Sequence, residues 1–451
     1  MTEAVDERGN PVGSRSPLAL AAAERALQRL MSFDEGAHAE MQAAAQADPG
    51  WLLPRLMQAG AQLARPDHAG LLAARRLVDE ASAWEAGATA RERAHLAALQ
   101  QLLEGRWHQA CDTWDELLLQ HPRDALALHW AHGWDLLRGD TASLRSRPAR
   151  SLPEWPEHDP LQPAVLALYA FGLAEGQQYA LAEETGRRAL AGGAWAPCAL
   201  RAVAQAMEAQ GRFEDGAAWL RQHQPAWADA PGVAHHLWWL MGLFRLEALD
   251  DGGALRLLDK HLAGDALHSA AQRVDAAALL WRLHLMGVDV GPRLQLLAQG
   301  WPLDDADAGL HALHDLHVVI ALAGGGEIGR AERWLARCAE RAMQPEDARR
   351  SNHATAREVG LPAMRAVLAY QRGDHAAVAQ ILYPLRRAVH RLGGSHAQRD
   401  LLDQTLLAAC ACSGQHSLGR ALFNERLMAK PATPLTRHWA LRLGLQERLP
   451  A

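Results

Sequence analysis

Three histidines recur at every third position in one short stretch of the chain. His311, His314 and His317 have this spacing, and Asp315 lies between two of them. On a helix, a spacing of three or four residues keeps side chains on one side, so the imidazoles could form one face of a metal site. A single helix rarely supplies a closed set of ligands, and hydrogen-bonded or solvated histidines are the commoner outcome. We therefore predict no bound metal and no other cofactor.

A glycine-rich segment follows directly. Gly324, Gly326 and Gly329 spell GxGxxG after the apolar run 318–323 and before a helical pattern, which is the order found in dinucleotide-binding sites. Such a site also needs a further strand, and residues 336–350 (ARCAERAMQPEDARR) show no strand pattern. The segment is therefore predicted to be a turn between two helices.

Other catalytic signatures are missing from the sequence. It contains no GxSxG elbow, no HExxH and no GxxxxGK[ST]. The five cysteines are scattered without CxxC spacing, which is typical of reduced thiols in the cytoplasm rather than of disulfides or zinc sites. Whether the protein is an enzyme stays open, and no catalytic residue is predicted.

The bulk composition excludes two classes of partner. The chain has 451 residues and a net charge of −6, with no block of like charges, so no basic face for nucleic acid is expected. The most apolar stretch, 237–244, is far shorter than the roughly 20 residues of a membrane span. The acidic N-terminus lacks the apolar part of a signal peptide. We expect a soluble cytoplasmic protein that binds neither nucleic acid nor membrane.

The elements that must position any site are helices. Ala and Leu are frequent, and β-branched residues are few. Ser16 followed by Pro17 predicts a helix over about 17–31, with Ser16 as its N-cap. Small and bulky residues then recur at the offsets of a tetratricopeptide second helix. Two copies fit this spacing well, Ala37, Met41, Ala44 and Pro49, and Ala110, Trp114, Leu117 and Pro122.

This repetition predicts one continuous array in which each hairpin buries its apolar face against the next. Residues 1–15 are expected to form a flexible tail, and residues 16–451 a single repeat domain. Two inserted loops are predicted, one over 139–163, where prolines are too frequent for a helix, and one over 343–361. Capping boxes are predicted at Thr89-x-x-Glu92 and Ser395-x-x-Gln398.

Three segments of the sequence resemble the tetratricopeptide repeat protein 38 family. They are ARERAHLAALQQLLEGRWHQACDTWDELLLQHPRDALAL (90–128), ALYAFGLAEGQQYALAEETGRRAL (167–190) and AREVGLPAMRAVLAYQRGDHAAVAQILYPLRRAVHRLGGSHAQRD (356–400). The last contains a sequence similar to the family's G-G-S-x-A-Q-R-D signature. The resemblance covers most of the chain, from about residue 90 to 430, and implies a helical-repeat fold more than a function.

The resemblance also implies a set of pocket residues, several of which differ here. The family's H-x-x-x-H-x-x-E helix corresponds to Arg201, Gln205 and Glu208, so both histidines are replaced. Its H-N-x-W-H segment corresponds to 236–240, which keeps His236 and Trp239 but not the Asn or the second His; the N-D-x-H stretch keeps Asp315 and His317. The candidate ligand-binding residues are Arg201, Gln205, Glu208, His236, Trp238, Trp239, Asp275, Asp315, His317, Gln398, Arg399 and Asp400.

Taken together, the sequence predicts an all-α, TPR-like α-solenoid of about seven or eight antiparallel hairpins. The first hypothesis for its function is a binding or scaffold protein whose concave face takes a peptide or protein partner. The alternative is a closed superhelix with a polar pocket that binds or transforms a small molecule, in which His317 would be the best general-base candidate. Buried charges that converge would favour the alternative, and an open groove would favour the first hypothesis.

Overall fold

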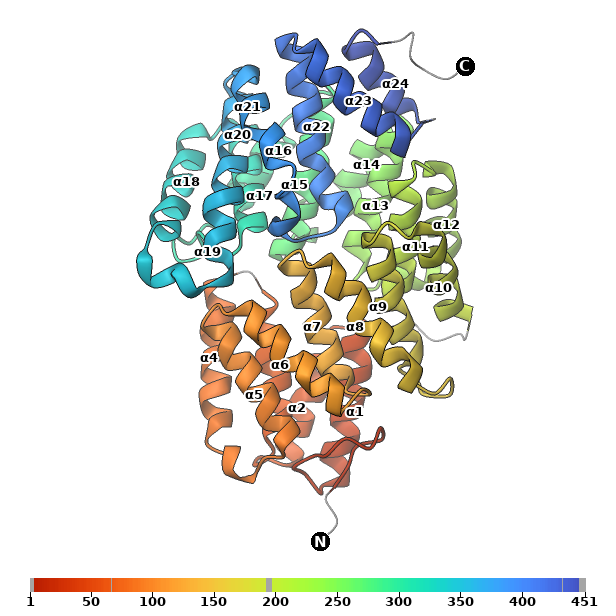
Figure 1. The fold of residues 1–451 in the computed structure, drawn as a ribbon, viewed down its shortest axis with the longest axis vertical. Coiled ribbons are helices and arrows are strands. Elements are labelled where there is room, and N and C mark those ends of the chain that lie inside the picture. Colours follow the sequence, from red (N-terminus) through yellow and green to blue (C-terminus); the bar gives the residue numbers. More distant parts are fainter. Residues whose placement is uncertain (1–3, 66, 192–196, 432, 446–451) are drawn as a thin grey trace. The chain divides into compact units, whose positions relative to one another are not determined.

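The protein is all-helical in the residues that the computed structural model describes, which are 4–65, 67–191, 197–431 and 433–445 (Figure 1). The only extended pairing in these ranges is an isolated bridge between Val5 and Pro11. The chain divides into two compact units, residues 1–202 with 348–351, and residues 203–347 with 352–451. We call them unit 1 and unit 2 and describe each by itself.

Unit 1 is built from consecutive helices joined by short turns. Its helices are α1 (Pro17–Met31), α2 (Ala37–Ala47), α3 (Leu52–Leu63), α4 (His68–Ser82), α5 (Ala90–Leu103), α6 (Trp107–Gln120), α7 (Ala125–Leu137), α8 (Thr141–Ser151), α9 (Gln162–Glu175) and α10 (Tyr179–Ala191). Neighbours along the chain pack on each other, as in α1 with α2, α3 with α4 and α5 with α6. Helix α11 (Pro197–Ala209) begins in unit 1 and ends in unit 2.

Unit 2 continues the same pattern. Its helices are α12 (Phe213–Trp227), α13 (Ala234–Glu247), α14 (Asp251–His261), α15 (Ala270–Leu285), α16 (Arg293–Gly300), α17 (Ala312–Gly324), α18 (Ile328–Ala342), α19 (Ser351–Thr355), α20 (Leu361–Gln371), α21 (His375–Leu385), α22 (His396–Ser413), α23 (His416–Ala429) and α24 (Pro434–Arg442). Such a succession of packed neighbouring helices is consistent with an α-solenoid.

Several local predictions are confirmed. Helix α1 covers 17–31, and Ser16 Oγ accepts the N–H of Ala19 at 3.3 Å. Both expected capping boxes are present, at Thr89 with Glu92 and at Ser395 with Gln398. The GxGxxG segment forms the turn between α17 and α18, where Gly326 has a φ of 83° that other residues rarely adopt.

The two expected loops are largely helical, which corrects their prediction. Residues 141–151 form α8, capped by Asp140, with Pro148 inside the helix. Pro148 cannot donate to the carbonyl of Leu144, and this carbonyl lies against Gly172 of α9, where a Cβ would come within 2.3 Å of its oxygen. In the second segment, 345–349 is a 3₁₀ turn, followed by α19 and a π-helical turn over 356–360. Prolines and polar residues were thus poor indicators of loops.

The segment expected to be a flexible tail packs against unit 1 in its described part, from residue 4. Val12 N donates to Ala4 O at 2.9 Å, and Arg8 forms a two-bond ion pair with Glu24 of α1. Val12 and Ser14 are buried. Side-chain contacts with α1 therefore hold a segment that lacks any helical pattern of its own.

In unit 2 the first helices of successive hairpins pack on one another. Helix α15 contacts α13 and α17 on either side, and it also contacts α22. Trp281 of α15 donates its Nε1–H to Thr405 Oγ1 of α22 at 3.0 Å, across 124 residues of sequence. Residues 312–323 of α17 are all buried, including the polar residues His314, Asp315 and His317. The inner faces of these helices are enclosed within unit 2.

Candidate functional site

Polar and charged side chains gather on the enclosed faces of helices in unit 2. We call them the polar cluster: Glu208, His236, Glu247, Asp275, Arg282, His317, Gln398, Asp400, Gln404, Arg426 and Lys430. They come from α11, α13, α15, α17 and α22, from α23, and from the residue that follows α23. Most are under a tenth exposed. Burying such groups is costly unless each finds a partner, so the pairing of every member is informative.

Asp275 on α15 is the acceptor in the first part of the cluster. His236 Nδ1 lies 3.0 Å from Asp275 Oδ2, and His235 Nε2 lies 3.7 Å from the same oxygen. Burial raises the pKa of Asp275, but His236, His235 and a hydrogen bond from Gln398 outweigh it and the pKa is lowered. The carboxylate can only accept, so Nδ1 of His236 is the donor in this contact, and Nε2 is the other nitrogen of the ring. That Nε2 is buried and has no hydrogen-bond partner among the described residues.

Gln398 joins the capping of α22 to this carboxylate. Its Oε1 accepts the backbone N–H of Ser395 at 2.9 Å, which completes the capping box and fixes which side of the amide is oxygen. Its Nε2 then lies 3.4 Å from Asp275 Oδ1. Gln398 therefore both caps α22 and contacts Asp275 in the polar cluster. These are the structural role and the site role that the sequence left open for this segment.

The second part of the cluster is a network of ion pairs. Lys430 Nζ donates to Glu208 Oε1 and to Glu247 Oε1, the latter at 2.9 Å. Arg426 Nη2 also donates to Glu247 Oε1, at 2.8 Å, and its Nη1 lies 4.0 Å from Asp400. Burial would lower the pKa of Lys430, but the charges of Glu208 and Glu247 outweigh it and the pKa is raised. Burial raises the pKa of Glu247, but the charges of Arg426 and Lys430 outweigh it and the pKa is lowered, so Lys430 and Glu247 are both charged at neutral pH.

Arg282 on α15 differs from the other cations because its guanidinium has no carboxylate within 4.0 Å in the described part of the chain. Its side chain is fully buried, and its Nη1 and Nη2 donate to the carbonyls of Ala278 and Ala397 at 3.0 and 2.6 Å. Its Nε finds no partner there. Burial lowers the pKa of Arg282, and only more distant acids, Asp400 first, oppose this. A buried cation without a direct counter-ion needs compensation.

His317 on α17 presents a lone pair to the same region. Its Nδ1–H donates to the carbonyl of Leu313 at 2.7 Å, so its Nε2 is an acceptor. The ring is fully buried, and burial lowers its pKa to about 4, with the Arg282 charge contributing. His317 is therefore neutral at pH 7. No described residue donates to its Nε2.

Three further polar side chains in unit 2 have buried atoms with no partner within the described ranges. The atoms concerned are Oε1 and Nε2 of Gln205, Oε1 of Gln404 and Nε1 of Trp239. Trp239 lies near two members of the cluster: it stacks on His236 with ring centroids 5.0 Å apart, and the Arg282 guanidinium lies 5.9 Å from its centroid. Several unsatisfied groups in one buried region indicate a place for water or a ligand.

Four of the predicted site residues lie elsewhere. Trp238 points away from Trp239 and stacks on His261, with centroids 3.7 Å apart. Arg201 belongs to unit 1, where it covers the ring of Phe171. Arg399 donates to the carbonyls of Gly393 and Gly394.

Asp315 is the fourth, and it faces a different helix from His317. Its Oδ1 accepts from Trp334 Nε1 of α18 at 3.1 Å and from the N–H of Gly309 at 3.2 Å. The two residues are two apart on α17, so their side chains point in different directions. Asp315 and His317 thus do not belong to one constellation.

Five cluster members were missed by the sequence reading: Glu247, Arg282, Gln404, Arg426 and Lys430. A helical signal exists for two of them, because Arg282 is seven residues after Asp275 and Glu247 is eleven after His236, spacings that return to the same face. Lys430 carries a signal of another kind, since it is one of only two lysines in the chain.

Among the described residues, no group of three or more His, Cys, Asp and Glu side chains is arranged to hold a metal ion. All five cysteines are free thiols, and only Cys412 is exposed.

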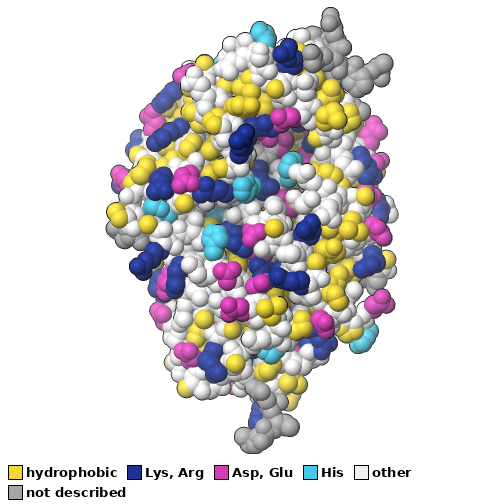
Figure 2. All heavy atoms as spheres, viewed as in Figure 1, with side chains coloured by type: hydrophobic (Ala, Val, Ile, Leu, Met, Phe, Trp, Pro, Cys, Tyr) yellow, Lys and Arg dark blue, Asp and Glu magenta, His cyan; other side chains and the backbone are white. Residues whose placement is uncertain are grey.

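No helix in the described ranges has the length and apolarity needed to cross a membrane. On the face shown in Figure 2, basic and acidic side chains are interspersed. No protein-family model matches this chain.

Proposed function

We propose that unit 2 is a binding module for a small organic acid, held in the polar cluster of a TPR-like closed helical array. The ligand carboxylate would sit on Arg282, and a ligand hydroxyl or N–H would donate to Nε2 of His317. The observation that carries this proposal is the buried Arg282 guanidinium, which has no carboxylate in ion-pair range among the residues that the structure describes. A charge-assisted hydrogen bond from Arg to a carboxylate is among the stronger polar interactions, and it would supply the missing counter-charge.

The neutral state of His317 sets a second requirement on the ligand. Because its pKa is lowered to about 4, its Nε2 accepts and does not donate at neutral pH. A simple aliphatic acid would leave this lone pair unsatisfied, which costs binding free energy. A hydroxy acid or an acid with an amide N–H should therefore bind more tightly than the plain acid of equal size.

Three side chains at the edge of the polar cluster are partly exposed to solvent. The side chains of His235, His236 and Asp400 are 18%, 13% and 16% exposed. Asp275, Arg282 and His317 are at most 2% exposed. Peptide recognition by these three residues, the function first expected from the sequence, would require unit 2 to open. Peptide binding at other surfaces of the protein stays a prediction. Membership of the tetratricopeptide repeat protein 38 family and a cytoplasmic location also stay predictions.

Thermal unfolding of the full chain with a panel of small molecules tests the proposal. The panel contains plain acids, hydroxy acids, and alcohols and amines of matched size. Hydroxy acids should raise the melting temperature most, because they can bind both Arg282 and His317. A ligand present at 100 times its Kd adds about 2.7 kcal/mol to the stability of the folded state. Absence of any stabilisation by acids over amines and alcohols would contradict the proposal.

Variants assign the binding to the cluster. Arg282→Gln should abolish stabilisation by acids, and His317→Phe should remove the preference for hydroxy acids over plain acids. Arg293→Gln is the matched control, since Arg293 forms a surface pair with Asp259 at 2.7 Å. Arg282→Lys keeps the charge in case Arg282→Gln does not fold. Equal acid binding by Arg282→Gln and Arg293→Gln would place any acid site elsewhere.

A further inference from the structure

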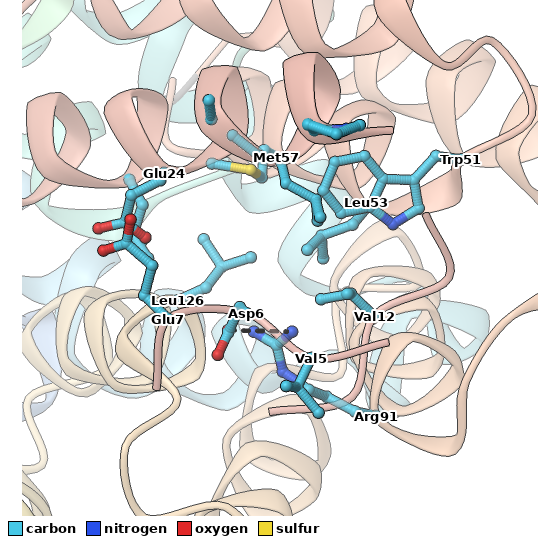
Figure 3. A pocket seen from close by; sticks show the side chains of 15 residues that line it. Val5, Asp6, Glu7, Val12, Glu24, Trp51, Leu53, Met57, Arg91 and Leu126 are labelled. Atoms are coloured by element: carbon cyan, nitrogen blue, oxygen red, sulfur yellow. Dashed lines mark ion pairs between the residues drawn. The ribbon is translucent and has the colours of Figure 1, made fainter. Parts of the chain in front are cut away.

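Unit 1 contains a cavity that is separate from the polar cluster. It has a volume of about 260 Å³ and lies between α1, α3 and the N-terminal segment before α1. Figure 3 shows Met57, Leu53, Trp51 and Val12 around it. All four of these side chains are at most 5% exposed. An apolar cavity of about 150 Å³ is large enough to hold benzene, so this one can hold a somewhat larger organic molecule.

The charges on the cavity wall are unbalanced. Three carboxylates line it, those of Asp6, Glu7 and Glu24, but only one cation, Arg91. Arg91 is already neutralised, because its Nε lies 2.6 Å from Asp124 Oδ2, and it lies only 3.8 Å from Asp6. Arg8, behind the wall, pairs with Glu24, so Glu7 is the lining carboxylate that no arginine of the described residues neutralises.

Glu7 and Glu24 lie on the same side of the cavity, opposite Trp51 and Val12 (Figure 3). Glu24 is engaged by Arg8 at 2.6 and 2.8 Å and by Gln28 at 3.0 Å. Glu7 makes no hydrogen bond or ion pair with any residue that the structure describes, and it is exposed to solvent. One end of the cavity thus offers a carboxylate that is available to a cation, while the other end is apolar.

We propose that this cavity binds a small aromatic or aliphatic amine, with the apolar group between Trp51, Leu53 and Met57 and the ammonium group beside Glu7. Burial of the apolar part supplies the affinity, and the carboxylates select the positive charge. An anion of the same size would place its charge beside Glu7 and is disfavoured.

The N-terminal segment gives this site a fixed wall. Val5, Asp6 and Val12 line the cavity from a loop closed by the bond from Val12 N to Ala4 O. The loop is fixed to α1 by the Arg8–Glu24 pair and to residue 123 by the bond from Arg123 to Arg8 O. A wall held in place this way leaves less conformational entropy to lose when a ligand binds.

Calorimetric titration of the full chain at neutral pH tests the proposal with three probes of one shape: 2-phenylethylamine, 2-phenylethanol and phenylacetate. We expect the amine to bind most tightly, the alcohol about 3- to 5-fold more weakly, and phenylacetate weakest, as a partly exposed ion pair would give. Equal binding of the three probes, or no saturable binding of the amine, overturns the proposal.

Two pairs of variants locate the site. Glu7→Gln should reduce amine affinity to that of the alcohol and leave alcohol binding unchanged, whereas Glu35→Gln, an exposed carboxylate away from the cavity, should change neither. Ala21→Phe and Leu20→Trp should fill the cavity and abolish binding of both probes. Both side chains line the cavity without being fully buried, so at least one variant is expected to fold with a wild-type melting temperature.

Other results from these variants would overturn the assignment. Equal losses in Glu7→Gln and Glu35→Gln would reflect only the net charge of the protein, and retained binding in a folded filling variant would place the amine elsewhere. Arg282→Gln should leave amine binding intact. The amine site and the proposed acid site of unit 2 can therefore be confirmed or rejected independently.

Discussion

Lys430 Nζ lies 2.9 Å from Glu247 Oε1, although 183 residues separate them in sequence. The same ammonium donates to Glu208, and all three side chains are at most 5% exposed. One cation thus serves two buried carboxylates from α11 and α13 and holds the residues after α23 against both helices. The value of such a contact lies less in its net attraction than in the cost of leaving its partners unpaired.

Removing this ammonium should therefore destabilise unit 2 strongly. Lys430→Met leaves Glu208 without its cation and Glu247 with Arg426 alone, and we expect a loss of about 3–5 kcal/mol in the free energy of unfolding, measured in urea. Lys260→Met removes the only other lysine, which is exposed at the end of α14, and should change stability by less than about 0.5 kcal/mol. Similar losses in the free energy of unfolding for the two variants would show that the buried ion-pair network stabilises the protein no more than an exposed lysine does.

Local features of the fold were predictable because they depend on neighbours in sequence. Ser16 and Pro17 predict where α1 begins, since an N-cap and a first-turn proline act within one helical turn. The turn at Gly326 follows from its spacing and from the helical patterns on both sides. The prolines around α8 predict a loop, yet a helix forms, because a helix tolerates a proline where the freed carbonyl can face a glycine of the neighbouring helix, here Gly172.

The site was predictable only in part, for a physical reason. Asp275 and Gln398 were both predicted, yet their contact spans 123 residues, and no local pattern encodes it. Arg282 was missed because an arginine in an apolar helix has the same sequence signature whether it is paired, solvated or awaiting a ligand. Which of these roles Arg282 has depends on the residues of α22 that face it, and tertiary packing alone determines those residues.

The pH dependence of stability should reveal Asp315. Burial raises its pKa to about 7, against the hydrogen bonds from Gly309, Cys338 and Trp334 and the charge of Arg341. The folded state favours the protonated carboxyl, so this group stabilises the fold at acid pH. That contribution is lost as the pH rises from about 4 through about 7. His317, with a pKa lowered to about 4, has the opposite sign: its contribution is present above about pH 6.5 and lost as the pH falls through about 4.

A variant separates the two groups. Asp315→Asn keeps acceptors for Trp334 and Gly309 but cannot ionise, so its stability relative to wild type should rise with pH between about 4 and 7, by up to about 1.4 kcal/mol per pH unit. Urea unfolding at several pH values measures this difference. Asp305→Asn, at a carboxylate that is 73% exposed, should show little slope. A flat difference for Asp315→Asn would indicate an ordinary pKa at Asp315.

The approach of α8 and α9 depends on Gly172. A Cβ there would lie 2.3 Å from the carbonyl oxygen of Leu144 and 2.6 Å from Arg145 Cα, both backbone atoms that cannot move aside cheaply. We expect Gly172→Ala to reduce the stability of unit 1 by about 1–3 kcal/mol. Gly133→Ala is the matched control within α7, because a Cβ there meets nothing within 4 Å. It should be stabilising by about 1 kcal/mol, the usual helical gain from Gly to Ala. Thermal melting of both variants decides the matter, and a stabilising Gly172→Ala would contradict the close packing.

The contact between Gln398 and Asp275 can be separated from helix capping by a pair of equivalent substitutions. Gln398→Glu preserves a side chain suited to the capping box but places a second carboxylate where the amide now lies 3.4 Å from Asp275. Repulsion between the two should cost about 1–3 kcal/mol near pH 7, and less near pH 4, where one carboxyl of the pair takes up a proton. Gln272→Glu makes the same change in the capping box of α15, where Gln272 Oε1 accepts from Ser269 N at 2.7 Å. A negative charge in that first turn is favourable by a few tenths of a kcal/mol. Urea unfolding of both variants at the two pH values should therefore show opposite signs near neutrality, and matching behaviour would reduce Gln398 to a cap alone.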